Sequence, residues 1–228
     1  MRNLHPLAWM ALGASLAGDP ALAQIATNVA VSSGAIANPP PIVEKELGKA
    51  WSFSAAVSGY LVPDSRDYVQ PTVTADRDWL HLEARYNYEA LDTGSVWVGY
   101  NVHVGDQLSL DFTPMLGGVF GDTAGVAPGG EITLRWWKLQ LYSEGEYVFD
   151  RRDSSGSFFY TWSELSLAPV DWFRFGLVVQ RTKVYQTDFD LQRGLLLGFS
   201  SRRVDFTTYV FNPDAHRPTV VLAVGLNF

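Results

Sequence analysis

Charged side chains in this sequence recur at every second position, in stretches where the positions between them are largely apolar. His81, Glu83 and Arg85 are spaced in this way, and so are Glu144 and Glu146. A period of two places such residues on one face of a β-strand. Carboxylates and guanidinium groups that share a face pair with one another, or attract cations where the carboxylates are in excess.

The charged positions that share this polar face by parity are spread over most of the chain, and carboxylates outnumber arginines among them. Charges on an enclosed face must be paired or hydrated, so two interpretations stay open. Either the groups interlock and fill the interior, or unpaired carboxylates line a narrow wet passage. The predicted lining residues are Glu83, Arg85, Asp111, Glu131, Arg135, Glu144, Glu146, Glu164, Arg174 and Asp205.

Two histidines on the same face are candidates for metal binding. Pairing of the stretches 79–89 and 94–104 would place His81 opposite His103, with Asp111 nearby. Two imidazoles and a carboxylate suit a metal ion, but no ligand-spacing motif supports the set. Because this face must be polar in any case, we expect ordinary wall residues, and we predict neither a metal nor another cofactor.

The elements that position these groups are strands throughout. Val96, Val98 and Tyr100 alternate with Trp97 and Gly99, and comparable patterns extend to the end of the chain. Turn residues divide this part of the sequence into about twelve strands of some ten residues each, the length that a tilted strand needs to cross a bilayer. The predicted strands are 51–62, 67–76, 79–89, 94–104, 108–119, 128–136, 139–150, 157–168, 172–184, 190–200, 204–212 and 219–228.

The predicted loops alternate in length, with short turns after the even-numbered strands and longer loops after the odd-numbered ones. A two-residue turn at Arg77 and Asp78 would place Thr72 beside Glu83, and the turn near Val170 would bring Glu164 close to Arg174. Short turns at one end and long loops at the other are typical of bacterial transmembrane barrels, in which the short turns are periplasmic.

Aromatic residues gather near the predicted strand ends, as in the aromatic girdles of membrane barrels. We assign Trp79, Trp136, Trp172 and Phe228 to the membrane interface. The other aromatic residues near strand ends are Tyr60, Tyr68, Phe149, Phe158, Tyr185 and Phe211.

Composition limits the class of protein. The 228 residues carry a net charge of -7, which argues against nucleic acid as a partner, and they include no cysteine. Residues 1–23 have the basic start, the apolar stretch and the A-x-A end of a secretory signal peptide. Residues 24–49, rich in small residues and proline, are predicted to form a flexible periplasmic extension, and 50–228 the barrel.

The last nine residues, VVLAVGLNF, alternate apolar positions and end on an aromatic residue. This pattern resembles the C-terminal assembly signature of Gram-negative outer-membrane β-barrel proteins. The resemblance implies an all-β, closed antiparallel transmembrane barrel in the bacterial outer membrane. It also implies lipids and lipopolysaccharide as surroundings, and the barrel-assembly machinery as a partner in biogenesis.

The function predicted from these features is a narrow porin-like channel for small polar solutes. Twelve-stranded members of the class include oligosaccharide channels, but those for acidic oligosaccharides have basic interiors, unlike this one. A lipid-acting enzyme is an alternative, because outer-membrane phospholipase A also has twelve strands. Ser109 and His103 are the candidates here, yet parity points both away from lipid.

Two further alternatives remain. A structural or surface-interaction barrel would have an interior filled by salt bridges and would display only its loops. A soluble sandwich or lipocalin-like barrel would turn its apolar face inward, and alternation alone does not distinguish it from a membrane barrel.

Overall fold

The computed structural model describes residues 50–228 apart from 64, 153 and 185–189. The predicted signal peptide and extension lie outside the described residues. No helix in the described part of the chain is long and apolar enough to cross a membrane.

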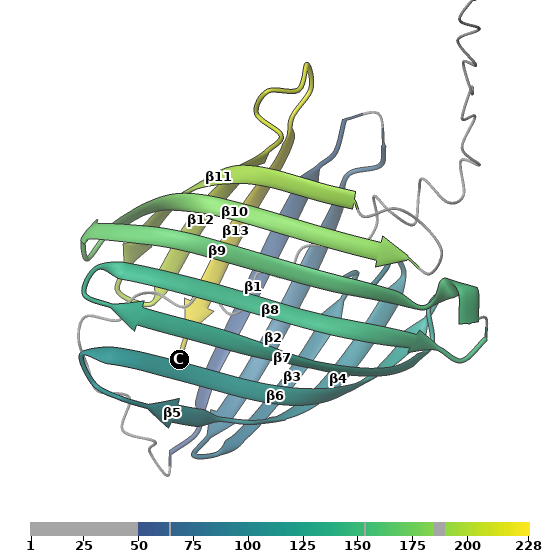
Figure 1. Ribbon diagram of the computed structural model, residues 1–228, viewed down its shortest axis with the longest axis horizontal. Helices are drawn as coiled ribbons and strands as arrows, with labels where there is room; N and C mark the ends of the chain where they lie inside the picture. The colour runs from purple at the N-terminus through teal and green to yellow at the C-terminus, as the bar shows by residue number, and fades with distance from the viewer. Residues whose placement is uncertain (1–49, 64, 153, 185–189) are drawn as a thin grey trace, which may run out of the picture.

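The described chain is almost entirely antiparallel sheet (Figure 1). A single 3-10 turn, η1 (Ser154–Gly156), interrupts it between two strands. The strands are β1 (Ser52–Leu61), β2 (Tyr68–Arg77), β3 (Leu80–Tyr86), β4 (Thr93–Tyr100), β5 (Val102–Val104), β6 (Leu108–Gly121), β7 (Gly125–Trp136), β8 (Leu139–Asp150), β9 (Phe158–Val170), β10 (Phe173–Val184), β11 (Asp190–Ser201), β12 (Val204–Phe211) and β13 (Thr219–Asn227).

The sheet closes on itself, so the protein is a twelve-stranded β-barrel. Each strand pairs with its neighbour in sequence except β4 with β5, and β1 pairs with β13. The predicted strand 94–104 is divided at Asn101 into β4 and β5, and both parts pair with β6. Counted as one strand, they give a wall of twelve strands. Closure removes the exposed strand edges that would otherwise pair with other chains.

The end of the chain is held within this wall. The Phe228 amide donates to the Phe53 carbonyl at 2.9 Å, and β13 pairs with β1 from Ser54–Asn227 to Leu61–Val220. The first and last strands therefore meet along their length, as the expected closed barrel requires.

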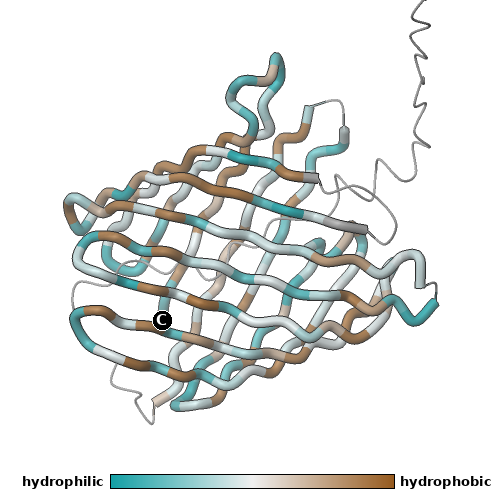
Figure 2. The backbone as a smooth tube through the Cα atoms, viewed as in Figure 1, coloured by the Kyte–Doolittle hydropathy of each residue, from teal (hydrophilic) through white to brown (hydrophobic). Residues whose placement is uncertain are grey.

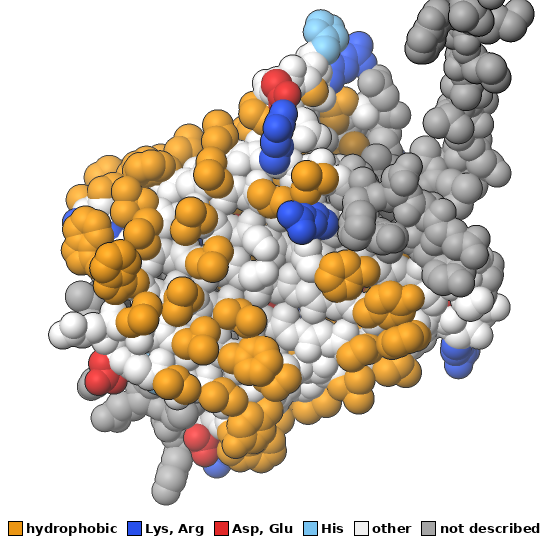
Figure 3. All heavy atoms as spheres, viewed as in Figure 1, with side chains coloured by type: hydrophobic (Ala, Val, Ile, Leu, Met, Phe, Trp, Pro, Cys, Tyr) orange, Lys and Arg blue, Asp and Glu red, His pale blue; other side chains and the backbone are white. Residues whose placement is uncertain are grey.

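The outer surface is apolar. Val96, Val98 and Tyr100 are each at least half exposed, whereas Trp97 between them is buried. Figure 2 shows the same alternation along most strands, and Figure 3 shows hydrophobic side chains over the outer wall, with charged ones mainly towards its edges. A water-soluble barrel would have the opposite arrangement, so the soluble alternative is wrong.

The two ends of the barrel differ in their connections. One, the short-turn end, has the connections 78–79, 105–107, 137–138, 171–172 and 202–203. The other, the long-loop end, has 62–67, 87–92, 122–124, 151–157 and 212–218, and the connection from β10 to β11 lies outside the described residues. The predicted alternation of loop lengths is confirmed except at 122–124, where β7 begins at Gly125 rather than at residue 128.

One predicted register is wrong by two residues. The first short turn is formed by Asp78 and Trp79, and Asp78 adopts φ 53°. In consequence Thr72 faces Arg85 rather than Glu83. A shift of two residues conserves the face of the sheet but changes every cross-strand neighbour.

Candidate functional site: the interior of the barrel

The interior contains every charged residue predicted to line it. Glu83, Arg85, Asp111, Glu131, Arg135, Glu144, Glu146, Glu164, Arg174 and Asp205 all occupy inward positions of their strands and are buried or half-buried. Their part in lining a passage stays a prediction. Contacts divide nine of them into three groups: one around Arg85, one around Arg174 and one around Asp111. The tenth, Asp205, interacts electrostatically with Arg174 and accepts a hydrogen bond from Asn227.

Arg85 lies at the centre of the first group, one residue before the end of β3. Its guanidinium donates to Oε2 of Glu83 at 2.8 Å and to Oε2 of Glu146 at 3.2 Å, and Oε1 of Glu131 is 3.9 Å away. Because Glu146 belongs to β8, Arg85 reaches across the interior and not only along its own strand. The guanidinium also lies 4.0 Å from the centroid of the Tyr88 ring and 4.7 Å from that of Trp97.

Carboxylates are in excess around this guanidinium. Glu131 and Glu144 are cross-strand partners, and the hydroxyl groups of Tyr88 and Tyr142 donate to Glu144. Glu83 and Glu146 each use Oε2 for Arg85, while Oε1 of each is buried and has no hydrogen-bond partner among the described residues. The group therefore has acceptor oxygens that its own donors do not saturate.

The second group, around Arg174, is differently balanced. The guanidinium donates to Oε2 of Glu164 at 3.3 Å and to Oγ1 of Thr207 at 2.9 Å. Glu164 and Arg174 are therefore close together, as predicted. Trp162 and Tyr209 both donate to Oε1 of Glu164, at 2.8 and 2.9 Å. One carboxylate thus receives three donors, and only one of them is charged.

The third group lies near the short-turn end. Asp111 accepts from Nδ1 of His103 at 2.7 Å and also from Arg135. His103 faces Asp111 across the β5–β6 pair, and the expected pairing of His81 with His103 is wrong, because His81 faces Gly99 instead. No cluster of His, Cys, Asp or Glu suited to a metal ion occurs among the described residues.

Ser109 is on the inner wall opposite Arg135, and the imidazole of His103 bonds to Asp111. A hydrolase acting on membrane lipid would need its nucleophile and base together on the outer surface. The geometry of these two residues therefore does not support the lipid-acting alternative.

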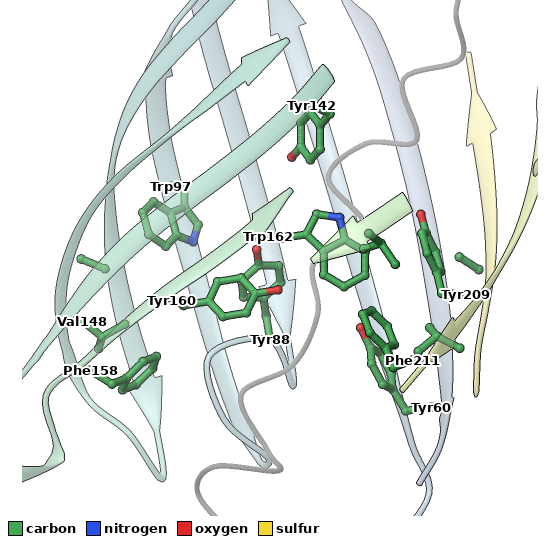
Figure 4. Close-up of a cluster of buried hydrophobic side chains, with 14 of the residues drawn as sticks. Tyr60, Tyr88, Trp97, Tyr142, Val148, Phe158, Tyr160, Trp162, Tyr209 and Phe211 are labelled. Carbon is green, nitrogen blue, oxygen red and sulfur yellow. The ribbon is translucent and has the colours of Figure 1, made fainter. Parts of the chain in front are cut away.

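Aromatic side chains fill much of the remaining interior, a feature that the sequence prediction missed. Trp97, Tyr160, Trp162 and Tyr209 point inward and are at most 3% exposed (Figure 4). Trp162 packs edge-on against Tyr209, with ring centroids 5.2 Å apart. These residues alternate in step with the charged residues of the polar face, and this alternation could have predicted that they point inward.

Four aromatic residues lie on the face opposite to the one expected. Tyr60, Phe158 and Phe211 are buried inside rather than exposed in the membrane girdle. Tyr88, which alternation with His81, Glu83 and Arg85 would place on the outer face, also points inward (Figure 4). Strand β3 ends at Tyr86, and Asn87 with φ 56° turns the chain, so the parity of the strand does not extend to Tyr88.

The interior is tightly packed beside Arg85. A pocket there is lined by Arg85, Tyr88, Trp97, Tyr160 and glycines of β7 and β8, and it leaves no room for a water molecule. A solute could enter this pocket only if its side chains moved.

Comparison with known proteins identifies the fold. No family model matches the chain, and no curated protein sequence does. Among solved structures, a KdgM porin aligns with a TM-score of 0.53 at 11% identity over 77% of this chain and 99% of that one. A KdgM porin in complex with disordered oligogalacturonate gives 0.50 at 12% identity, covering 78% and 98%. A NanC porin gives 0.50 at 11%, covering 78% and 99%.

At these identities the likeness concerns the fold alone. That fold is the closed antiparallel barrel of outer-membrane porins, and the apolar outer surface of the present chain suits it to the same surroundings. The protein is thus a β-barrel of the bacterial outer membrane.

Proposed function

We propose that this protein is a narrow porin-like channel whose interior favours small cations and neutral polar solutes. One observation carries the proposal: Glu83, Glu131, Glu144 and Glu146 gather around the guanidinium of Arg85 in the middle of the barrel. Carboxylates in a confined space of low dielectric constant attract cations and repel anions.

The same charge balance argues against acidic saccharides as solutes. A KdgM porin of the same fold has been seen with oligogalacturonate, a polyanion. A polyanion entering the present barrel would meet Glu131, Glu144 and Glu146 with Arg85 as their guanidinium partner, and like charges at close range are costly.

The tight packing beside Arg85 supports a second candidate, the structural barrel that only displays its loops. Its specific support is the absence of room for water beside Arg85. The channel proposal requires the Arg85 group to rearrange, whereas the structural barrel requires it to stay shut.

The ion selectivity of the purified barrel in planar bilayers separates the two. Under a tenfold KCl gradient we expect current steps with a reversal potential of the cation-selective sign, below the limit of about 59 mV for a perfectly selective monovalent pore. Glu131→Gln should lower that potential, because it removes one carboxylate that makes no close hydrogen bond to Arg85. The control is Asp214→Asn, which neutralises an exposed carboxylate in the 212–218 loop and should change nothing.

Selectivity for anions, or the same reversal potential in Glu131→Gln as in the wild type, would contradict the channel proposal. A complete absence of current from correctly folded wild-type barrel would favour the structural barrel.

We further propose an aromatic belt at the short-turn end. Trp79, Trp136, Trp172 and Phe228 are all at least half exposed and lie in or beside the turns and the terminus at that rim. Amphipathic rings favour the lipid headgroup level, so this rim would lie at the periplasmic interface, in contact with outer-membrane lipid. Lipopolysaccharide would then surround the opposite rim, and the exposed Phe228 would be available to the barrel-assembly machinery during insertion.

A further inference from the structure

The group around Arg85 has the form of a binding site for a planar cation, with the protein's own side chain as its occupant. The guanidinium lies over the rings of Tyr88 and Trp97 and contacts the carboxylates of Glu83 and Glu146. Aromatic faces and carboxylates together are the surroundings that proteins use to hold organic cations.

The walls of this site are held independently of Arg85. Nε1 of Trp97 donates to Oγ of Ser95 at 2.9 Å, and the Trp97 ring lies against Gly117, where an added Cβ would come within 2.5 Å of ring atoms. The hydroxyl of Tyr88 is fixed on Glu144. A site whose walls have their own partners remains organised when its occupant is removed.

The fit of Arg85 to this site is incomplete. It donates one N–H to each of two carboxylates, its own Nε has no partner, and neither does Oε1 of Glu83 or Glu146. These atoms are buried away from bulk solvent. A guanidinium without a tether is free to turn and bind both oxygens of one carboxylate in the bidentate manner.

We propose that the cage formed by Tyr88, Trp97, Glu83 and Glu146 is a binding site for small planar organic cations of the guanidinium and amidinium class. Arg85 occupies this cage as a tethered plug. This inference rests on the proposed channel function, because such a solute must enter the barrel. It specifies the solute class: the faces of the Tyr88 and Trp97 rings favour a flat delocalised cation over a compact ammonium or metal ion.

The test compares wild-type protein with Arg85→Ala in planar bilayers at constant ionic strength. Removal of the plug should raise the conductance several-fold. Guanidinium chloride at about 10 mM, far below denaturing concentrations, should then reduce the current of Arg85→Ala at least threefold. Equal concentrations of sodium or ammonium chloride should not. Adding Glu146→Gln to Arg85→Ala should weaken the block about tenfold.

Arg174→Ala provides the matched control. It also removes a buried inward arginine, but the carboxylate left behind keeps Trp162 and Tyr209 as donors. Guanidinium should not block this variant more than sodium does.

The outcomes distinguish this inference from the channel proposal. If Arg85→Ala conducts with cation selectivity but responds equally to guanidinium, ammonium and sodium, the cage assignment is overturned and the channel stands. If wild-type protein carries no current but Arg85→Ala carries one that guanidinium blocks, the cage stands and the native channel does not. If Arg85→Ala does not fold unaided, guanidinium should restore its heat-modifiable folded band, and failure to do so with every salt overturns the assignment.

Discussion

The groups around Arg85 and Arg174 are built from the same residue types but balance charge differently. Arg174 meets one carboxylate, Glu164, and neutral donors from Trp162 and Tyr209 complete that carboxylate's bonding. Arg85 lies among several carboxylates, and two of them keep a buried oxygen without a partner.

The Arg174 group is therefore a structural contact of the wall, whereas the Arg85 group has the features of a binding site. In the Arg174 group the Glu164 carboxylate receives three donors, so these contacts rigidify the wall near the short-turn end. In the Arg85 group carboxyl groups outnumber the guanidinium and acceptor oxygens are left over, so the group offers acceptors to a further hydrogen-bond donor. The position of a buried arginine inside a barrel therefore says less about its role than the donors around its carboxylates.

The largest expected difference is in stability. Arg85→Ala leaves several buried carboxylates facing one another and should lower the free energy of unfolding by about 3–5 kcal/mol. Arg174→Ala leaves Glu164 with two donors and should lower it by about 1–3 kcal/mol. Urea titration of the barrel in lipid vesicles measures both. Equal losses would remove the distinction between the two groups.

Packing of the Trp97 wall gives the next largest effect. Gly117→Ala would place a methyl group within 2.5 Å of the Trp97 ring, so the ring must shift, at a cost of about 1–3 kcal/mol. The neighbouring Gly118 has open space where its Cβ would be, so Gly118→Ala should stay within about 0.5 kcal/mol. The same urea titration compares the pair, and equal effects would show that Trp97 is not held by β6.

A smaller effect is expected from Tyr209→Phe. It removes one of the two neutral donors to Glu164 and should lower the free energy of unfolding by about 1 kcal/mol. Its conductance and reversal potential should equal those of the wild type, because the Arg85 group is untouched. A changed reversal potential would mean that the Arg174 group also controls permeation.

The smallest effect is expected near the short-turn end. The His103 side chain is 30% exposed, and Asp111 keeps Arg135 when the imidazole is lost. His103→Ala should therefore change the free energy of unfolding by less than about 1 kcal/mol. If the urea titration gave a loss of unfolding free energy as large as that of Arg85→Ala, the His103–Asp111 pair would be an important contributor to stability.

The barrel itself could be predicted from the sequence because the residues of each strand alternate between an apolar face and a polar face. Val96, Trp97 and Val98 reveal their orientation by period alone, with no knowledge of any partner strand. Register was less accessible: a change of one residue in where the turn at Asp78 begins altered every neighbour of β3 on β2. Tyr88 was misplaced because one left-handed residue, Asn87, ends the alternation.

The contents of the candidate site could be predicted, but its connections could not. Parity brought Arg85 and Glu146 into one interior, yet the bond between them joins residues 61 positions apart on strands that are not paired. Such contacts depend on side-chain length and barrel diameter, for which the sequence has no local signal. The aromatic filling was missed because Trp97 and Trp162 occupy polar-face positions and were not recognised as packing groups.

The reversal potential of the wild-type barrel under a KCl gradient tests the central claim most directly. An interior dominated by the carboxylates around Arg85 predicts current carried mainly by potassium, and a smaller preference after Glu131→Gln. A reversal potential at zero, or one of the anion-selective sign, would contradict it.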